Sequence, residues 1–425
     1  MEKTDPRYNA FLTVLENHLK PAMGCTEPIA IAYASAIARA TLGCLPEKVS
    51  VLVSGSIIKN AKSVTVPKTN GKKGIEVACA AGIIAGKPSR ELEVIEDLTA
   101  EDLAVIDNFL AKQLITVGMK PDARLFDILV IMEAGERSVS ARIADRHTNV
   151  VDVKLDGRVI ESKDLKNEDM GIDTNESYLS IESIFDFACT CDIADVERVL
   201  NRQITYNTAI AQEGMTGRWG VGVGKIILDC YGDQDVRVRA RAYAAAGSDA
   251  RMSGCELPVI INSGSGNQGI TVSIPVIEYA RELNATKEQL YRALVISNLV
   301  AIRQKMMIGY LSAYCGAISA GCASGAGIAY LNGGDLYIIN HTIVNCLAIL
   351  SGTICDGAKP SCAAKIASAV DAALMGYQMA IAGKQFRGGD GIIKKGVENT
   401  IDSIGRLGKD GMKQTNQEIL KIMIE

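Results

Sequence analysis

The chain of 425 residues changes its hydrophobic pattern near residue 170, and this change constrains the fold more than any other feature. Residues 48–54 and 124–157 contain runs that alternate between apolar and polar side chains, which is the period of β-strands. In the second part, apolar residues recur with the period of helices in a sequence rich in Ala and Gly. We therefore predict an α+β fold: a mixed domain over 1–170 with a small, mostly antiparallel sheet, and a helix-rich domain over 171–425. The N-terminal cysteine motif around Cys25 is expected to pack on the helix-rich domain.

Cys25 is predicted to lie at the entrance of a helix. Its segment PAMGCTEP contains Pro21 and Pro28, so one helix over 6–20 ends before it and a second runs over 29–42. The exposed amides at a helix N-terminus stabilise an anionic thiolate or a substrate carboxylate. Further helices are predicted over 75–86 and 101–117, and a loop over 54–69.

Composition and charge exclude several classes of protein. The net charge of −4, the pI near 5.7 and the aromatic content of 5% argue against a nucleic-acid-binding surface. The longest apolar stretches are interrupted by Gly, Asn or charge, and the start MEKTDPRYNA is charged, so neither a membrane span nor a secretory signal is expected. We therefore expect a cytoplasmic protein whose 12 cysteines are core residues, catalytic thiols or metal ligands.

Two cysteine pairs with the same spacing lie in the last third of the chain. Cys315 and Cys322 occur in YCGAISAGCASGAG, and Cys355 and Cys362 occur in ICDGAKPSCAAKIASA. Thiols flanked by Gly, Asp and Pro at the ends of elements are typical of cluster and metal sites. If both segments are helical, the cysteines of a pair lie about 10.5 Å apart along the axis, which is too far to bind one compact cluster.

One cysteine from each pair, together with Cys25, would then supply three thiolates. Three ligands on a cubane leave one iron open for substrate, just as a catalytic metal keeps an open position. Cys315 and Cys355 are favoured because turn-forming residues follow both, whereas Cys322 and Cys362 lie among small residues and are interpreted as packing residues. The cysteines in apolar runs are expected in the core: Cys44, Cys79, Cys230 and Cys346.

Two polar loops could contact a substrate. The loop INSGSGNQGI, residues 261–270, has flexible glycines and can present amides and hydroxyls to a carboxylate or phosphate. It also resembles the phosphate cup of pyridoxal-phosphate enzymes, and a plain turn between helices remains an alternative. The loop over 54–69 contains Lys59, which faces either an anionic substrate or solvent. None of the three histidines is expected to be catalytic, and His18 is placed on an exposed helix face.

The chain resembles the L-cysteine desulfidase family in five motifs that occur in order: GCTEPIAIA, GSIIKNAKSVTVP, NSGSGNQGI, YCGAISAGCASGAG and SGTICDGAKPSCAAKIASA. That family is related to the α-chain of bacterial iron–sulfur L-serine dehydratases. The resemblance implies a [4Fe–4S] cluster that is held by three cysteines and acts as a Lewis acid. Matched by motif, its ligands are Cys25, Cys315 and Cys355. Cys362 is an alternative, because the late cysteine pair is spaced differently in serine dehydratases.

The resemblance also implies β-elimination of L-cysteine to pyruvate, ammonia and sulfide in the helical domain over 171–425. An L-serine dehydratase using the same cluster and a non-catalytic iron–sulfur sensor remain alternatives. A small amino-acid substrate and a homo-oligomer are expected, with no nucleic-acid or membrane partner. Lys59 is the predicted general base, and a thiol or hydroxyl at the ligand site is the alternative. The residues predicted to orient the amino and carboxylate groups of the substrate are Thr26, Asn262, Ser263, Ser265 and Asn267.

Overall fold

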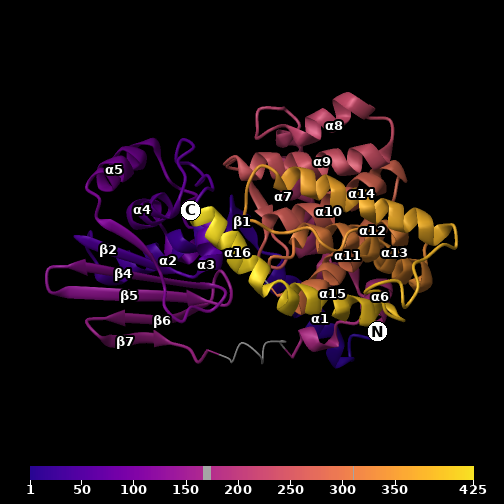
Figure 1. Ribbon diagram of the computed structural model, residues 1–425, viewed down its shortest axis with the longest axis horizontal. Coiled ribbons are helices and arrows are strands. Elements are labelled where there is room, and N and C mark those ends of the chain that lie inside the picture. Colours follow the sequence, from indigo (N-terminus) through magenta and orange to yellow (C-terminus); the bar gives the residue numbers. More distant parts are fainter. Residues whose placement is uncertain (166–173, 310) are drawn as a thin grey trace.

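The computed structural model describes residues 1–165, 174–309 and 311–425. A part that contains the large sheet lies beside a larger body of helices (Figure 1). The predicted α+β class is confirmed, and so is the mostly antiparallel character of the sheet. The predicted boundary between 170 and 171 falls outside the described residues and stays a prediction.

The large sheet has the strand order β3-β2-β4-β5-β6-β7, in which only the β2–β3 pair is parallel. Its alternating sequence runs form strands as predicted, whereas β3 and β7 were not predicted. The helix expected over 101–117 is shorter, because α5 (Ala100–Ala111) ends and the chain then enters β3. The strands are β2 (Lys48–Val53), β3 (Ile115–Met119), β4 (Asp127–Ala134), β5 (Arg137–Ala144), β6 (Val150–Leu155) and β7 (Arg158–Ser162).

One face of this sheet is covered by α2 (Thr26–Leu42), which packs on β4 and β5. A second layer follows, since α4 (Ile75–Ala85) packs on α2 and α5 packs on α4. Small residues allow this close approach: a Cβ on Gly82 would lie only 2.1 Å from the carbonyl oxygen of Ala32. Any side chain at position 82 would therefore push the two helices apart.

The helical body is built around α10, α11 and α12, whose residues are mostly buried. Small residues again set the spacing, because a Cβ on Gly321 of α12 would lie 2.7 Å from the backbone of Ala369 in α14. The helices of this body are α6 (Ile181–Thr190), α7 (Ile193–Gly214), α8 (Val223–Tyr231), α9 (Val236–Met252), α10 (Gly266–Glu282), α11 (Lys287–Ile308), α12 (Gly316–Leu331), α13 (Leu336–Ile349), α14 (Cys362–Ile381) and α15 (Val397–Arg406).

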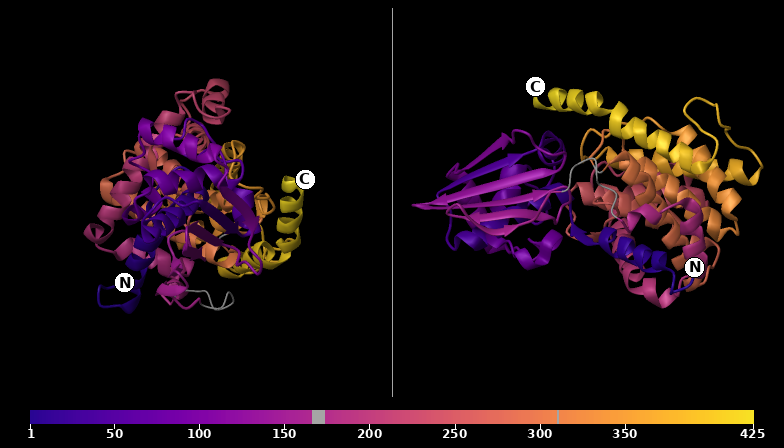
Figure 2. Two further views of the ribbon diagram at one scale, coloured as in Figure 1. Left: turned by 90° about the vertical axis from the view of Figure 1, so that its left-hand side faces the viewer. Right: turned by 90° about the horizontal axis from the view of Figure 1, so that it is seen from below.

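Both ends of the chain connect the part that contains the large sheet with the helical body. The N-terminal α1 (Pro6–His18) packs on α7 and α11, and β1 (Pro21–Met23) pairs with β8 (Pro258–Ile260) of the helical body. At the other end, α16 (Lys413–Ile424) leaves the helical body and contacts α3 (Gly55–Ala61) beside the sheet (Figure 2). The segment with Cys25 follows β1 directly, so it lies where the two parts meet.

Two local predictions are wrong. Residues 55–61 form the helix α3 within the expected loop, because Ser54 caps its N-terminus by accepting from the Ile57 amide. A helix this short gives little periodic signal in the sequence. His18 is buried rather than exposed, and its Nε2 lies 2.8 Å from Glu176 Oε1.

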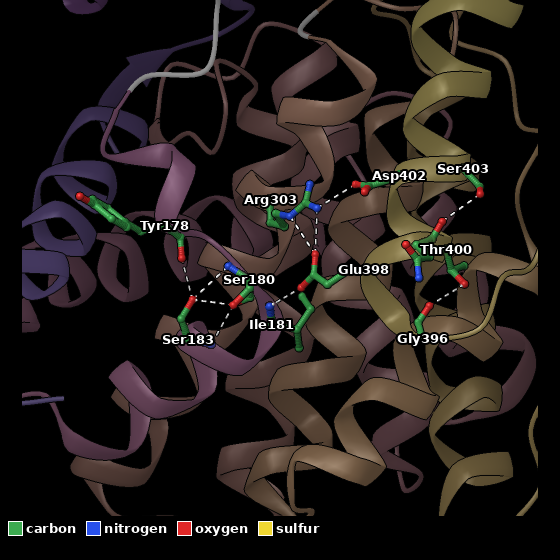
Figure 3. A network of polar contacts seen from close by, with 11 residues as sticks. Tyr178, Ser180, Ile181, Ser183, Arg303, Gly396, Glu398, Thr400, Asp402 and Ser403 are labelled. Atoms are coloured by element: carbon green, nitrogen blue, oxygen red, sulfur yellow. Dashed lines mark hydrogen bonds and ion pairs between the residues drawn. The ribbon is translucent and has the colours of Figure 1, made fainter.

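The C-terminal segment is tied to the helical body by a polar network (Figure 3). Arg303 of α11 donates to Glu398 and to Asp402 of α15, each at 2.8 Å. The other carboxylate oxygen of Glu398 accepts from the Ile181 amide at the start of α6. The network therefore joins α6, α11 and α15, from which the chain continues to α16. Across the described ranges, no helix is long and apolar enough to span a lipid bilayer.

Candidate active site

A cavity of about 100 Å³ lies where the two parts meet. Four cysteines line it, namely Cys25, Cys315, Cys355 and Cys362. Three charged side chains also line it: Glu27, Arg251 and Lys305. Its remaining polar lining side chains are those of Thr26, Asn60, Ser265, Asn267, Gln268, Ser312 and Tyr314.

Four helices begin at this cavity. Cys25 is the N-cap of α2 and Cys315 is the N-cap of α12, and neither thiol caps its own helix by a hydrogen bond. Ser265 is the N-cap of α10, and Cys362 is the first residue of α14. Helix N-termini carry partial positive charge and free amides. The cavity is therefore suited to thiolates and to an anionic ligand.

A short antiparallel contact holds Cys315 beside Cys355. Tyr314 pairs with Ile354, while the Cys315 amide donates to the Thr353 carbonyl at 3.0 Å and the Cys355 amide donates to the Ala313 carbonyl at 2.6 Å. Both cysteines are one residue away from the central pair. Because side chains alternate along extended chains, both cysteine side chains project to the same side.

Cys362 returns to the cavity because residues 355–361 are not helical, which differs from the helical geometry considered for both pairs. The chain turns at Gly357, whose φ is +96° and where a Cβ would lie 2.4 Å from the Lys59 carbonyl oxygen. In the first pair, by contrast, the chain between the two cysteines is helical, and Cys322 lies inside α12, where its Sγ faces the Ile343 carbonyl at 3.6 Å.

The other cysteines do not line the cavity. Cys79 and Cys346 are buried as expected. Cys44 and Cys230 are exposed, so their predicted place in the core is wrong. Cys44 follows the C-terminal end of α2 and Cys230 lies in the short α8, which covers the outside of α9. An apolar stretch at the margin of a fold leaves some of its residues facing solvent.

The four cavity cysteines fit a cluster better than a single ion. Nowhere in the described chain do three His, Cys, Asp or Glu side chains converge as a mononuclear site requires. A [4Fe–4S] cubane takes one thiolate per iron, and its ligands are therefore further apart than those of a single ion. Burial, together with the charge of Cys355, raises the pKa of Cys315 to about 12, and burial also raises the pKa of Cys25 and of Cys362. A bound metal would replace those protons.

Glu27 is a buried carboxylate at the Cys25 side of the cavity. Its Oε2 accepts from the Thr26 hydroxyl at 3.0 Å and faces the Cys25 thiol at 3.5 Å. Its Oε1 accepts from Asn60 at 3.4 Å and lies 3.8 Å from Nε2 of His147. Burial by itself raises the pKa of Glu27, but attraction to His147 and Arg251 outweighs burial and lowers the pKa to about 2. The group is therefore ionised at neutral pH.

Two buried cations face the same cavity from the helical body. Arg251, at the end of α9, is 3% exposed and lies against Gly266 at the start of α10. Lys305, in the last turn of α11, is also 3% exposed, and burial lowers its pKa. The positive charge of Arg251 acts on Cys25 and Glu27, and the pKa of Lys305 responds to the charges of Cys355, Cys315 and Glu27.

Lys59, the predicted base, does not line the cavity. Its Nζ donates to the Cys355 carbonyl at 3.1 Å and to Asn416 Oδ1 at 2.7 Å. Burial lowers the pKa of Lys59. These two contacts tie the Cys355 loop to α16.

The residues predicted to bind substrate divide into two groups. Thr26, Ser265 and Asn267 line the cavity. Asn262 points away from it and donates to Asn298 Oδ1 at 3.0 Å, and the Ser263 hydroxyl donates to the side chain of Asn262 at 2.9 Å. In the structure, Asn262 and Ser263 therefore support the loop before α10.

Sequence analysis missed the charged residues of the cavity, namely Glu27, Arg251 and Lys305. A signal for two of them exists in retrospect. Arg251 ends a helix rich in alanine, YAAAGSDARM, and Lys305 lies in the long apolar run LVISNLVAIRQKMMIG. Buried charges are costly unless they meet a partner or a ligand, so a charged residue in such a run indicates a site. His147 gave no comparable signal because it lies in a turn between strands.

The chain is similar to known proteins over most of its length. A family model described as the serine dehydratase alpha chain matches residues 89–421, which include Arg251 and Lys305 but not Cys25. A UPF0597 protein from Desulfitobacterium hafniense is 55% identical over 427 residues, covering 100% of this chain and 98% of that protein. Another from Lachnoclostridium phytofermentans is 50% identical and covers 98% of this chain and 100% of that protein. A third, from Phocaeicola vulgatus, is 37% identical, with 98% of each chain covered.

Proposed function

This chain belongs to the serine dehydratase alpha chain family. We therefore propose that it is a lyase that eliminates the β-substituent of a small amino acid. The substrate that we propose is L-cysteine, which would give pyruvate, ammonia and sulfide. The observation that carries this proposal is the single cavity in which four thiols meet a buried glutamate, arginine and lysine. The resemblance to serine dehydratase alpha chains noted from the sequence motifs is confirmed by the family match.

The proposed cofactor is a [4Fe–4S] cluster. Cys25, Cys315 and Cys355 would hold it, and Cys362 is the alternative ligand because it lines the same cavity. When bound, the cluster supplies a Lewis acid that assists departure of the β-substituent. The surrounding helix N-termini favour the thiolate form of these ligands, and so do the positive charges of Arg251 near Cys25 and of Lys365 near Cys315 and Cys362.

Elimination also needs a base for the α-proton of the substrate. Lys59 was predicted for this role, but its amine donates to two oxygens outside the cavity. Lys305 is better placed because it lines the cavity, and burial favours its neutral form. We therefore propose Lys305 as the base and Lys59 as a residue that positions the Cys355 loop. Loss of the proton and of the β-substituent gives an aminoacrylate, which hydrolyses to pyruvate and ammonia.

The same site supports a second candidate function. The family description favours L-serine as substrate, with hydroxide instead of thiolate as the leaving group. L-cysteine is preferred in this proposal because iron in a soft sulfur environment matches a thiolate better than hydroxide. A non-catalytic iron–sulfur sensor fits less well, because a sensor has no need of a buried acid and two buried cations beside its thiols.

The test is anaerobic purification of the full chain, analysis of its iron and sulfide, and assays of L-cysteine and L-serine side by side. We expect bound iron and sulfide, no retained pyridoxal phosphate, and a higher kcat/KM for L-cysteine. A higher kcat/KM for L-serine would make the protein a dehydratase using the same residues. Absence of turnover with both amino acids in iron-loaded protein would overturn the lyase proposal.

A further inference from the structure

We infer that Arg251 and Glu27 form a recognition pair for the two charged groups of an α-amino acid, with Arg251 binding the α-carboxylate and Glu27 binding the α-ammonium. This inference rests on the proposed function, since it specifies how the same cavity holds its substrate. Both side chains line that cavity, yet they come from different parts of the molecule.

Among the described residues, the buried guanidinium of Arg251 has no carboxylate within 4 Å, and Glu27 acts on it only from further away. Its Nε has no hydrogen-bond partner there. One terminal nitrogen donates to Asn267 Oδ1 at 3.1 Å, which fixes the orientation of the group. A buried unpaired guanidinium is costly, and its planar array of donors matches a carboxylate. An anionic ligand would supply the missing partner.

Glu27 provides the negative charge that complements Arg251 in the same cavity. Its carboxylate accepts from the neutral groups of Thr26 and Asn60 and faces the Cys25 thiol, but the only basic side chain within 4 Å of it in the described ranges is His147, at 3.8 Å. Nε2 of His147 has no hydrogen-bond partner there. An ammonium group on the ligand would give this buried carboxylate the close charged partner that it lacks.

The arrangement of charges gives the ligand a direction in the cavity. Arg251 belongs to α9 of the helical body and Glu27 belongs to α2 beside the sheet, and the charge of Arg251 acts on Glu27 and on Cys25. The charged head of the amino acid would therefore lie between the two parts of the molecule.

The position of Arg251 depends on Gly266, the first residue of α10. A Cβ on Gly266 would lie 2.2 Å from Arg251 Nε, so only glycine at the first position of α10 lets the guanidinium lie flat across the helix entrance. The amides at that entrance then face the same ligand as the guanidinium. This placement accounts for the glycine at position 266 without any substrate contact through Asn262 or Ser263.

The test uses three small ligands on the full chain, purified anaerobically. L-alanine has both charged groups but no leaving group at its β-carbon, propionate lacks the ammonium, and ethylamine lacks the carboxylate. Dissociation constants are measured by calorimetry for the wild type and for Arg251→Gln, Arg251→Lys and Glu27→Gln. The matched controls are Arg241→Gln, which lies on the same helix and pairs with Asp371, and Glu278→Gln, a buried carboxylate paired with Arg281.

We expect Arg251→Gln to weaken L-alanine and propionate by about tenfold to a hundredfold while leaving ethylamine unchanged, as for loss of a hydrogen bond to a charged group. Arg251→Lys should recover part of the propionate affinity. Glu27→Gln should weaken L-alanine and ethylamine by a similar factor and leave propionate unchanged. The two control variants should bind like the wild type.

Two results would separate this inference from the proposed function. Equal affinity of the wild type and both cavity variants for all three ligands, in a protein that still turns over L-cysteine, would overturn the inference alone. Absence of L-alanine binding and of turnover in the iron-loaded wild type would overturn both. A uniform loss of affinity for all three ligands in either variant would show a structural role and would also overturn the inference.

Discussion

At the scale of single residues, sequence patterns identify the cysteines of the cavity but not its charged side chains. Cys25, Cys315 and Cys355 were identified because cysteines beside turn-forming residues form a recognisable pattern. Arg251 and Lys305 were missed because each lies in a helix whose pattern is apolar and regular, so only the three-dimensional fold shows that both charges face one cavity. A pattern in the sequence locates thiols, whereas the pairing of charges depends on contacts between distant segments.

The base is best tested by comparing two buried lysines. We expect Lys305→Gln to lower kcat by about 10²–10⁴-fold, as for loss of a general base, while iron content and visible absorption stay at the wild-type level. Lys59→Gln should lower kcat less. Burial lowers the pKa of Lys305, so the rate of the wild type should rise with pH along a limb that lies below the ordinary pKa of lysine, and this limb should be absent in Lys305→Gln. Equal kcat losses in the two variants would remove Lys305 from the role of base.

At the scale of elements, the period of the sequence predicts strands β2, β4, β5 and β6 and the helical class of the second part, but not β3 and β7. The helices α3 and α16 depend on each other. α3 is capped by Ser54, and a Cβ on Gly55 would lie 2.4 Å from Leu420 of α16. The two helices are far apart in sequence, so no local pattern predicts the contact between them. Their junction also holds the Cys355 loop through Lys59.

Removal of the Asn416 amide tests this junction. Asn416→Ala takes one of two acceptors from the buried amine of Lys59, so we expect the free energy of unfolding to fall by about 1–3 kcal/mol. Urea unfolding of the full chain measures the loss. Lys421→Ala on the same helix is the matched control, because it removes only an exposed ion pair with Glu418 and should change stability by less than about 1 kcal/mol. Equal effects of the two substitutions would show that the buried contact is not important.

A second prediction at this scale concerns the N-terminus of α8, where Asp249 of α9 accepts from the Gly224 amide at 3.2 Å. Burial raises the pKa of Asp249 from 3.8 to about 6, despite the backbone amides that stabilise its ionised form. The folded protein then binds more protons than the unfolded chain between these values, so this group's contribution to stability falls as pH rises from about 4 through 6. Asp249→Asn removes this titration. Unfolding measured at pH 4.5 and 7.5 should show the wild type losing stability relative to the variant, and parallel profiles would contradict the assignment.

At the scale of the whole molecule, the sequence predicts two structural classes and a Cys25 segment that packs on the helical part, but not the pairings that bring the two parts together. The meeting depends on the β1–β8 pair and on α16, which join segments more than 200 residues apart in the first case and more than 350 in the second. Cys25 lies directly after β1, so this long-range pairing brings its thiol to those of the helical body. The cavity is therefore a product of the assembled fold rather than of either part.

If the cluster takes its ligands from both parts, its binding should stabilise the molecule as a whole. Anaerobically reconstituted protein should unfold at a higher temperature than protein treated with an iron chelator, because a ligand that binds only the folded state adds to its stability. Cys25→Ala, Cys315→Ala and Cys355→Ala should each lose this difference together with the visible absorption.

Cys322→Ala is the matched control, because Cys322 lies inside α12 and does not line the cavity. This variant should keep the absorption and the difference between loaded and chelated protein. Cys362→Ala decides between the two proposed ligand sets: loss of absorption there, with retention in Cys355→Ala, would move the third ligand to Cys362. Hydrogen exchange would show whether α2, which begins at Cys25, and α12, which begins at Cys315, are both protected on loading. Protection confined to the helical body would mean that Cys25 is not a ligand.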